Sequence, residues 1–155
     1  MNFIIPISLC DWSPVIQSIQ INRTLKHIGF RSCDISHSEC PVTKPRRPAP
    51  AWISNPKILR SICQAVASSL QITTALVFLE LKNIPLIQAD VNCLCKGIAN
   101  NRTLRHLSLN GCPIGDTGIA EICRALRHAP DLATMNISGC QITQIGAAHI
   151  AELIK

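Results

Sequence analysis

Cysteine is the residue type with the widest chemical scope in this sequence, which contains nine of them. Paired thiolates with C-x-x-C spacing are typical of zinc sites, and the sequence has no such pair. Cys93 and Cys95 are two residues apart, a spacing that on a helix turns them toward different faces. Cys33, Cys112 and Cys140 instead fall at one position of an internal repeat. We therefore expect reduced, structural thiols and no metal or other cofactor.

Histidines offer the other candidate chemistry. His27 and His106 occupy equivalent repeat positions, which could suggest a metal pair, but no carboxylate ladder accompanies them, so we interpret both as surface residues. No Ser/His/Asp or Cys/His arrangement and no glycine-rich phosphate loop is present. We predict that the chain is not an enzyme. The alternative is a cysteine-dependent enzyme, whose turnover would be abolished by alkylation of exposed thiols.

An internal repeat organises the sequence. Three segments, which begin at Leu76, Leu104 and Leu132, share the frame LxxLxLxx(C/I)x(I/L), with Ile84, Cys112 and Cys140 in the Cys slot. A fourth copy begins at Leu25. A fixed period of about 28 residues indicates stacked units rather than one closed core.

The first repeat is longer than the others. Leu25 and Leu76 are 51 residues apart, so this unit carries an insertion of about 23 residues, at about 36–56. Its segment 40–50 contains four prolines and the basic cluster Lys44, Arg46 and Arg47, which predicts an extended, mobile basic loop. Helical spacing resumes at Asn55-Pro56. We divide the chain into a divergent segment, 1–10, and a repeat domain, 11–155.

Each strand segment is followed by a helical pattern. Ile119, Ile122, Cys123 and Leu126 form an apolar face after the turn at 114–118. A unit that holds a strand, a turn and a full helix within this period has the length of the ribonuclease-inhibitor class of leucine-rich repeat. The predicted fold is an α/β leucine-rich-repeat solenoid, a horseshoe with parallel strands on the concave face and helices on the convex face.

Residues between the leucines should face the concave side and bind a partner. Phe78 is the main candidate anchor, because it is an aromatic residue among polar ones. Its alternative role is to cover the insertion or pack on the flanking unit. The predicted partner-binding residues are Lys26, His27, Arg31, Phe78, Glu80, Lys82, Arg105, His106, Ser108, Asn110, Thr134 and Asn136.

Composition favours protein partners. The net charge is +6, but the basic residues are scattered and only five residues are aromatic, so a nucleic-acid surface is not expected. The apolar segment 1–10 lacks a basic start and is too short to span a bilayer, which favours a cytoplasmic protein without a membrane partner. Asn22, Asn101 and Asn136 begin Asn-x-Ser/Thr sequons, which we interpret as turn and strand residues.

Several motifs resemble one family, that of the 78-kilodalton centrosomal protein. They are Asp11-Trp12-Ser13-Pro14, Leu104-x-x-Leu107-Ser108-Leu109-x-x-Cys112-Pro113-Ile114-Gly115-Asp116, Ile122-Cys123, Gly146-Ala147-Ala148-His149 and Leu153-Ile154-Lys155. The similarity covers 11–155 and includes a basic insertion in the first repeat. The first ten residues do not fit, and the later repeats and coiled coil of the family are not in this sequence, which looks like a partial member.

The resemblance implies a centrosome- or centriole-associated adaptor at the cilium base. Such an adaptor supports centrosome and cilium assembly and regulates a ubiquitin ligase by docking to centrosomal proteins or a ligase subunit. The alternative is another intracellular repeat protein of the same class, an immune-receptor fragment or an enzyme inhibitor. An inhibitor should have an acidic, Trp-rich concave face, whereas this face is mildly basic. We also expect self-association through the uncapped C-terminal repeat.

Overall fold

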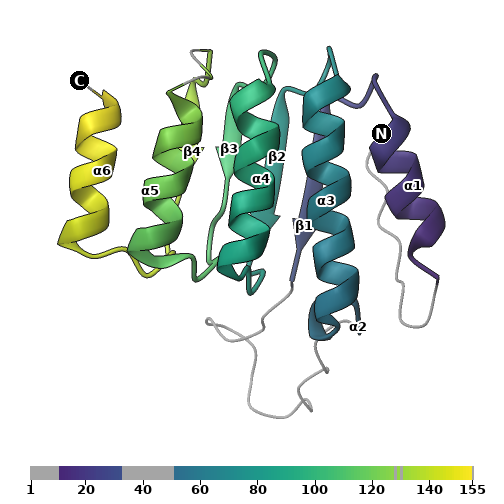
Figure 1. Cartoon of the computed structure of the whole chain (residues 1–155), viewed down its shortest axis with the longest axis horizontal. Coiled ribbons are helices and arrows are strands. Elements are labelled where there is room, and N and C mark those ends of the chain that lie inside the picture. The colour runs from purple at the N-terminus through teal and green to yellow at the C-terminus, as the bar shows by residue number, and fades with distance from the viewer. Residues whose placement is uncertain (1–10, 33–50, 128, 130, 155) are drawn as a thin grey trace, which may run out of the picture.

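The computed structural model describes residues 11–32, 51–127, 129 and 131–154. Four strands form one sheet, and the helices lie side by side on one of its faces, in chain order (Figure 1). The elements are α1 Ser13–Ile21, β1 His27–Arg31, α2 Ala51–Ser54, α3 Pro56–Ile72, β2 Phe78–Lys82, α4 Gln88–Asn100, β3 His106–Ser108, α5 Gly115–Leu126, β4 Thr134–Asn136 and α6 Gln144–Ile154.

Strand pairing confirms the repeat frame. All three pairs are parallel, and the order of the strands in the sheet is β1-β2-β3-β4. Leu79 pairs with Leu107 and Leu107 with Met135, so equivalent residues of adjacent repeats lie side by side. Ile28 pairs with Leu79, which confirms the fourth copy across the insertion. The expected α/β fold with parallel strands and repeated helices is therefore confirmed.

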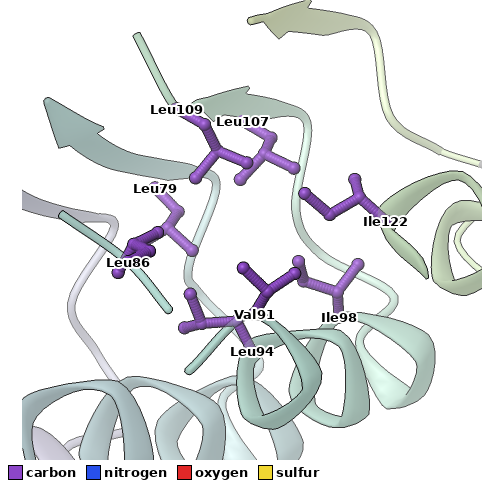
Figure 2. Close-up of a pocket in the computed structure, with 8 residues that line it drawn as sticks. All are labelled: Leu79, Leu86, Val91, Leu94, Ile98, Leu107, Leu109 and Ile122. Atoms are coloured by element: carbon purple, nitrogen blue, oxygen red, sulfur yellow. The ribbon is translucent and has the colours of Figure 1, made fainter. Parts of the chain in front are cut away.

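The core lies between the sheet and the helices. Figure 2 shows how side chains of β2, β3, α4 and α5 converge there with those of Leu86 and Leu109. They enclose a cavity of about 10 Å³ and are all aliphatic: Leu79, Leu86, Val91, Leu94, Ile98, Leu107, Leu109 and Ile122. That volume is about one water-sized probe sphere, so this part of the core has no room for a ligand.

Polar turns at the repeat boundaries account for the sequon asparagines. Asn101 is buried, and its side chain accepts hydrogen bonds from the N–H groups of Thr103 and Leu104 while donating to Leu70 O at 2.8 Å. Asn22 accepts equivalent bonds from Thr24 and Leu25. Asn136 lies at the end of β4. The interpretation of these asparagines as turn and strand residues is confirmed.

The cysteine slot lies a few residues after each strand, and its thiol hydrogen-bonds to a backbone carbonyl of the preceding repeat. The buried Cys112 thiol donates to Leu81 O at 3.3 Å, and the Cys140 thiol donates to Leu109 O at 3.0 Å. Burial raises the pKa of Cys112 to about 11, so the donor stays protonated near neutral pH. The six described cysteines are free thiols. A structural role for this slot is confirmed; Cys33 lies outside the described residues.

Two details differ from the sequence prediction. The short helix α2 lies at the end of the predicted insertion, where no element was expected. The indole of Trp52 in α2 packs against Trp12 and Phe30, with ring centroids 5.7 and 5.9 Å apart, and this aromatic packing explains the helix. Helix α5 begins at Gly115, although the pattern had placed 114–118 in a turn.

Other predictions fall on residues outside the described set. These are the basic loop with Lys44, Arg46 and Arg47 and the divergent segment 1–10.

The helix predicted at Asn55-Pro56 is confirmed, because the Asn55 side chain accepts from Lys57 N at 3.0 Å and caps α3. Among the described residues, no helix combines the length and apolar character needed to cross a membrane.

Candidate protein-binding face

The sheet face opposite the helices carries the side chains that alternate with the core leucines. In β2, Leu79 and Leu81 are buried, whereas Phe78, Glu80 and Lys82 are partly exposed. We call this surface the strand face. The strands place His27, Gly29, Arg31, Phe78, Glu80, Lys82, His106, Ser108, Thr134 and Asn136 on it. The repeat frame predicts that Lys26, Val77, Arg105, Asn110, Ala133 and Ser138 belong to it as well.

One row across this face is aromatic. His27, Phe78, His106 and Thr134 occupy the same register position on the four strands. The ring centroids of His27 and Phe78 are 4.5 Å apart, and those of Phe78 and His106 are 5.5 Å apart. His106 Nδ1 and Thr134 Oγ1 form a hydrogen bond of 2.7 Å. We call these four residues the aromatic row.

Phe78 combines features of its two predicted roles. Its contacts with His27 and His106 show that it packs on the flanking units, as the alternative required. Phe78 is nevertheless partly exposed. An aromatic ring held between two tilted rings loses little side-chain entropy on binding, so packing on the neighbours is compatible with a role as an anchor.

The position of Phe78 also bears on whether His27 and His106 form a metal pair. His27 and His106 are on strands β1 and β3, with β2 between them. The Phe78 ring packs against both imidazoles, with its centroid 4.5 Å from that of His27 and 5.5 Å from that of His106. In this arrangement each imidazole faces the Phe78 ring rather than the other imidazole.

Ion pairs modify the charge of the face. Arg31 Nε donates to Glu80 Oε2 at 2.7 Å, and only 12% of the Glu80 side chain is exposed. Arg105 pairs with Asp131 at 3.0 Å. Among the described residues, no ion pair is found for Lys26 or Lys82. The strand face thus keeps an excess of positive charge, although two of its arginines are neutralised by carboxylates.

Ser108 is poorly placed for a partner contact. It pairs in register with Glu80 and Asn136, as the frame requires, but it is only 7% exposed. The alternation rule gives the direction of a side chain and does not account for cover by larger neighbours. Asn110 is partly exposed, and its amide donates to Ser138 O at 3.4 Å. Thr134 and Asn136 are exposed.

Comparison with known proteins supports the repeat assignment. A family model described as "Leucine Rich repeat" matches residues 100–123, the unit that contains β3. The "Centrosomal protein of 78 kDa" of Xenopus tropicalis is 34% identical over 99 residues, 60% of this chain. Its namesake in Homo sapiens is 32% identical over 103 residues, 63% of this chain.

This chain is similar to the centrosomal proteins of 78 kDa. The resemblance predicted from the motifs is confirmed. The aligned segments are 13% and 14% of the length of these two relatives. The part of the chain that aligns therefore spans about one seventh of the length of each relative.

Sequence reasoning missed one residue and one ion pair that shape the strand face. Asp131, which neutralises Arg105, lies in the turn before β4 and carried no repeat signal. The pairing of Arg31 with Glu80 joins residues 49 positions apart. The two lie on neighbouring strands, and the aligned repeat frame could have revealed this pairing, since their positions differ by two residues in register.

Proposed function

We propose that this chain is a non-enzymatic protein-binding scaffold and that the strand face is its docking surface. The observation that carries the proposal is the aromatic row, in which Phe78 is held between His27 and His106 on a mostly polar face. Rigid aromatic anchors surrounded by polar contacts are typical of protein interfaces. The contact surface that we propose is the set of partner-binding residues predicted from the sequence, from Lys26 through Asn136. Ser108 lies beneath this surface.

The chemistry of the face favours a partner with some negative charge. Lys26 and Lys82 provide cationic groups on either side of the aromatic row, and the Glu80 carboxylate is held by Arg31. We propose that the sheet curves into a horseshoe with the strand face on its concave side. A concave face would let one partner contact all four strands.

We propose that the scaffold acts as an adaptor at the centrosome and centriole. Support comes from the similarity to two centrosomal proteins of 78 kDa. Roles at the cilium base, in cilium assembly and in the regulation of a ubiquitin ligase are part of the same proposal. We also propose that 11–155 form one repeat domain, with the insertion as part of its first repeat.

Localisation of tagged chains in ciliated cells tests this proposal. Wild-type chain should concentrate at centrioles, and Phe78→Ala should reduce that signal severalfold because the anchor is removed. Arg124→Ala, on the exposed surface of α5, is the matched control and should behave as wild type. A diffuse wild-type signal, or equal signals for the two variants, would count against the proposal.

A second contact of this chain is proposed at the β4 edge. Met135 and Ile137 are partly exposed, whereas their equivalents Leu107 and Leu109 are each 2% exposed. An edge strand with apolar side chains favours pairing with another strand. We propose that a second copy of the chain pairs there, which light scattering would detect as a dimer. A stable monomer at high concentration would refute the pairing.

A further inference from the structure

A groove lies at the ends of three helices, apart from the strand face. It runs between the junction of α2 and α3 and the start of α4, and its volume is about 450 Å³. None of its lining residues belongs to the strand face. The residues that matter for its chemistry are Ile53, Lys57, Leu59, Arg60, Ile87 and Asp90. Its size is within the range of ligand-binding clefts.

Asp90 is the unusual group in this groove. It is only 3% exposed, and its Oδ2 accepts a hydrogen bond from Ile87 N at 3.2 Å, which caps the start of α4. Its Oδ1 is buried without a hydrogen-bond partner within the described part of the chain. Arg60 Nε is 3.7 Å from this oxygen, beyond hydrogen-bond distance. A buried acceptor of this kind is costly, so a donor entering the groove would be stabilised.

The other lining residues restrict which donor fits. Lys57 and Arg60 both line the groove and are both exposed, so together they disfavour the entry of another cation. Ile53, Leu59 and Ile87 supply apolar surface, and Ile87 is 54% exposed. A fitting group therefore has an apolar body and a neutral N–H or O–H donor. Among protein side chains, tyrosine and tryptophan combine these two properties.

We propose that this groove binds a tyrosine side chain of a partner protein. The phenol hydroxyl donates to Asp90 Oδ1 and accepts from Arg60 Nε, whereas an indole N–H can only donate. The ring packs against Ile53, Leu59 and Ile87. None of the 155 residues given is a tyrosine, so neither this segment nor a second copy of this segment supplies the ring. The groove is a further contact site, separate from the strand face and from the β4 edge.

Titration of the isotope-labelled chain with small probes tests the proposal by nuclear magnetic resonance. p-Cresol, which has the tyrosine ring and hydroxyl, should shift the amide signals of Arg60, Ile87 and Asp90. 4-Methylanisole, in which the hydroxyl is methylated, should bind at least about tenfold more weakly because it cannot donate to a charged acceptor. Equal affinity for the two probes, or no shift at these residues, would overturn the proposal. Indole binding as tightly as p-cresol would overturn the assignment to tyrosine.

Two variants test the roles of the polar groups. In Asp90→Asn the amide oxygen must accept from Ile87 N, which puts an NH₂ donor in place of Oδ1. The preference for p-cresol over 4-methylanisole should therefore disappear. Arg60→Met leaves Asp90 in place and, because Arg60 is exposed, should fold and bind p-cresol severalfold more weakly.

The matched control is Glu152→Gln, a carboxylate-to-amide change at an exposed residue of α6 outside the groove. It should bind p-cresol as wild type does. An unchanged preference for p-cresol over 4-methylanisole in Asp90→Asn, or unchanged p-cresol binding in Arg60→Met, would refute the proposal, and either variant alone suffices as a test if the other does not fold.

Discussion

Asp116 and Thr143 join two neighbouring repeats through both oxygens of one carboxylate. Oδ1 of Asp116 accepts from the backbone N–H of Thr143 at 2.8 Å, and Oδ2 accepts from its hydroxyl at 2.6 Å. Oδ1 also accepts from Gly146 N at 3.0 Å. Thr143 directly precedes α6, so a side chain at the start of α5 binds backbone donors at the start of the next helix.

Removal of this carboxylate should loosen the last repeat and make its stability less dependent on pH. The hydroxyl and then the backbone N–H of Thr143 lower the pKa of Asp116 from its usual value. A lowered folded-state pKa stabilises the fold above the unfolded pKa, and this contribution is lost as pH falls through the folded pKa. Asp116→Ala should therefore lower the melting temperature by a few degrees at pH 7 and by less in acid.

Melting curves of both proteins between pH 2 and pH 7, about the range over which aspartate titrates, check this expectation. Glu121→Gln, which alters an exposed pair with Arg124, is the control and should change little. A constant difference between wild type and Asp116→Ala across that range would contradict the linkage.

Equivalent positions in adjacent repeats should respond differently to truncation. Leu107 is 2% exposed between the sheet and the helices, so Leu107→Ala should cost about 2–5 kcal/mol of unfolding free energy. Met135 pairs beside it in β4 but is partly exposed, so Met135→Ala should cost less than half as much. Urea denaturation measures both. Equal losses would mean that the β4 edge is as well buried as β3.

Two of the three sequon asparagines, Asn101 and Asn136, should also differ in how much their substitution changes stability. Asn101 is 2% exposed and binds three backbone groups, so Asn101→Ala should destabilise by about 3 kcal/mol. Asn136 is exposed, so Asn136→Ala should stay within about 0.5 kcal/mol of wild type. Chemical denaturation provides the values. A well-folded Asn101→Ala chain with unchanged stability would refute the structural role.

Of the three cysteines in α3 and α4, Cys93 should be the first to react with an alkylating reagent. Burial raises the pKa values of Cys63 and Cys95 to about 12, which suppresses their thiolates near neutral pH. Cys93 is only partly buried. Brief iodoacetamide treatment followed by peptide mass spectrometry should show modified Cys93 before the other two. Early modification of Cys63 in the folded chain would contradict the packing of α3.

The sequence predicted those features that the repeat period determines. Leucines at 76, 79 and 81 recur at 104, 107 and 109, which was enough to place β2 beside β3 and to direct Phe78 and His106 to one face. Features that depend on contacts between unlike segments could not be predicted. Helix α2 depends on Trp52 packing against Trp12, and no period relates these residues.

In the candidate sites, too, some features follow from the spacing of residues and others depend on contacts between different segments. The direction of a side chain on the strand face follows from alternation along the strand. The burial of Ser108 depends instead on how the surrounding residues pack. The groove at Asp90 requires the start of α4 to lie against Arg60 of α3, and spacing alone does not reveal this contact. Local patterns thus predict elements and faces, whereas charge pairing and cavities arise from packing between units.

Site-specific photo-crosslinking in cells tests the central claim most directly. A photoreactive amino acid at Lys82, on the strand face, is compared with the same residue at Lys96, on the exposed side of α4. If partners dock on the strand face, the Lys82 position should yield discrete protein adducts that Phe78→Ala abolishes, and the Lys96 position should yield few. Adducts from Lys96 and none from Lys82 would contradict the account.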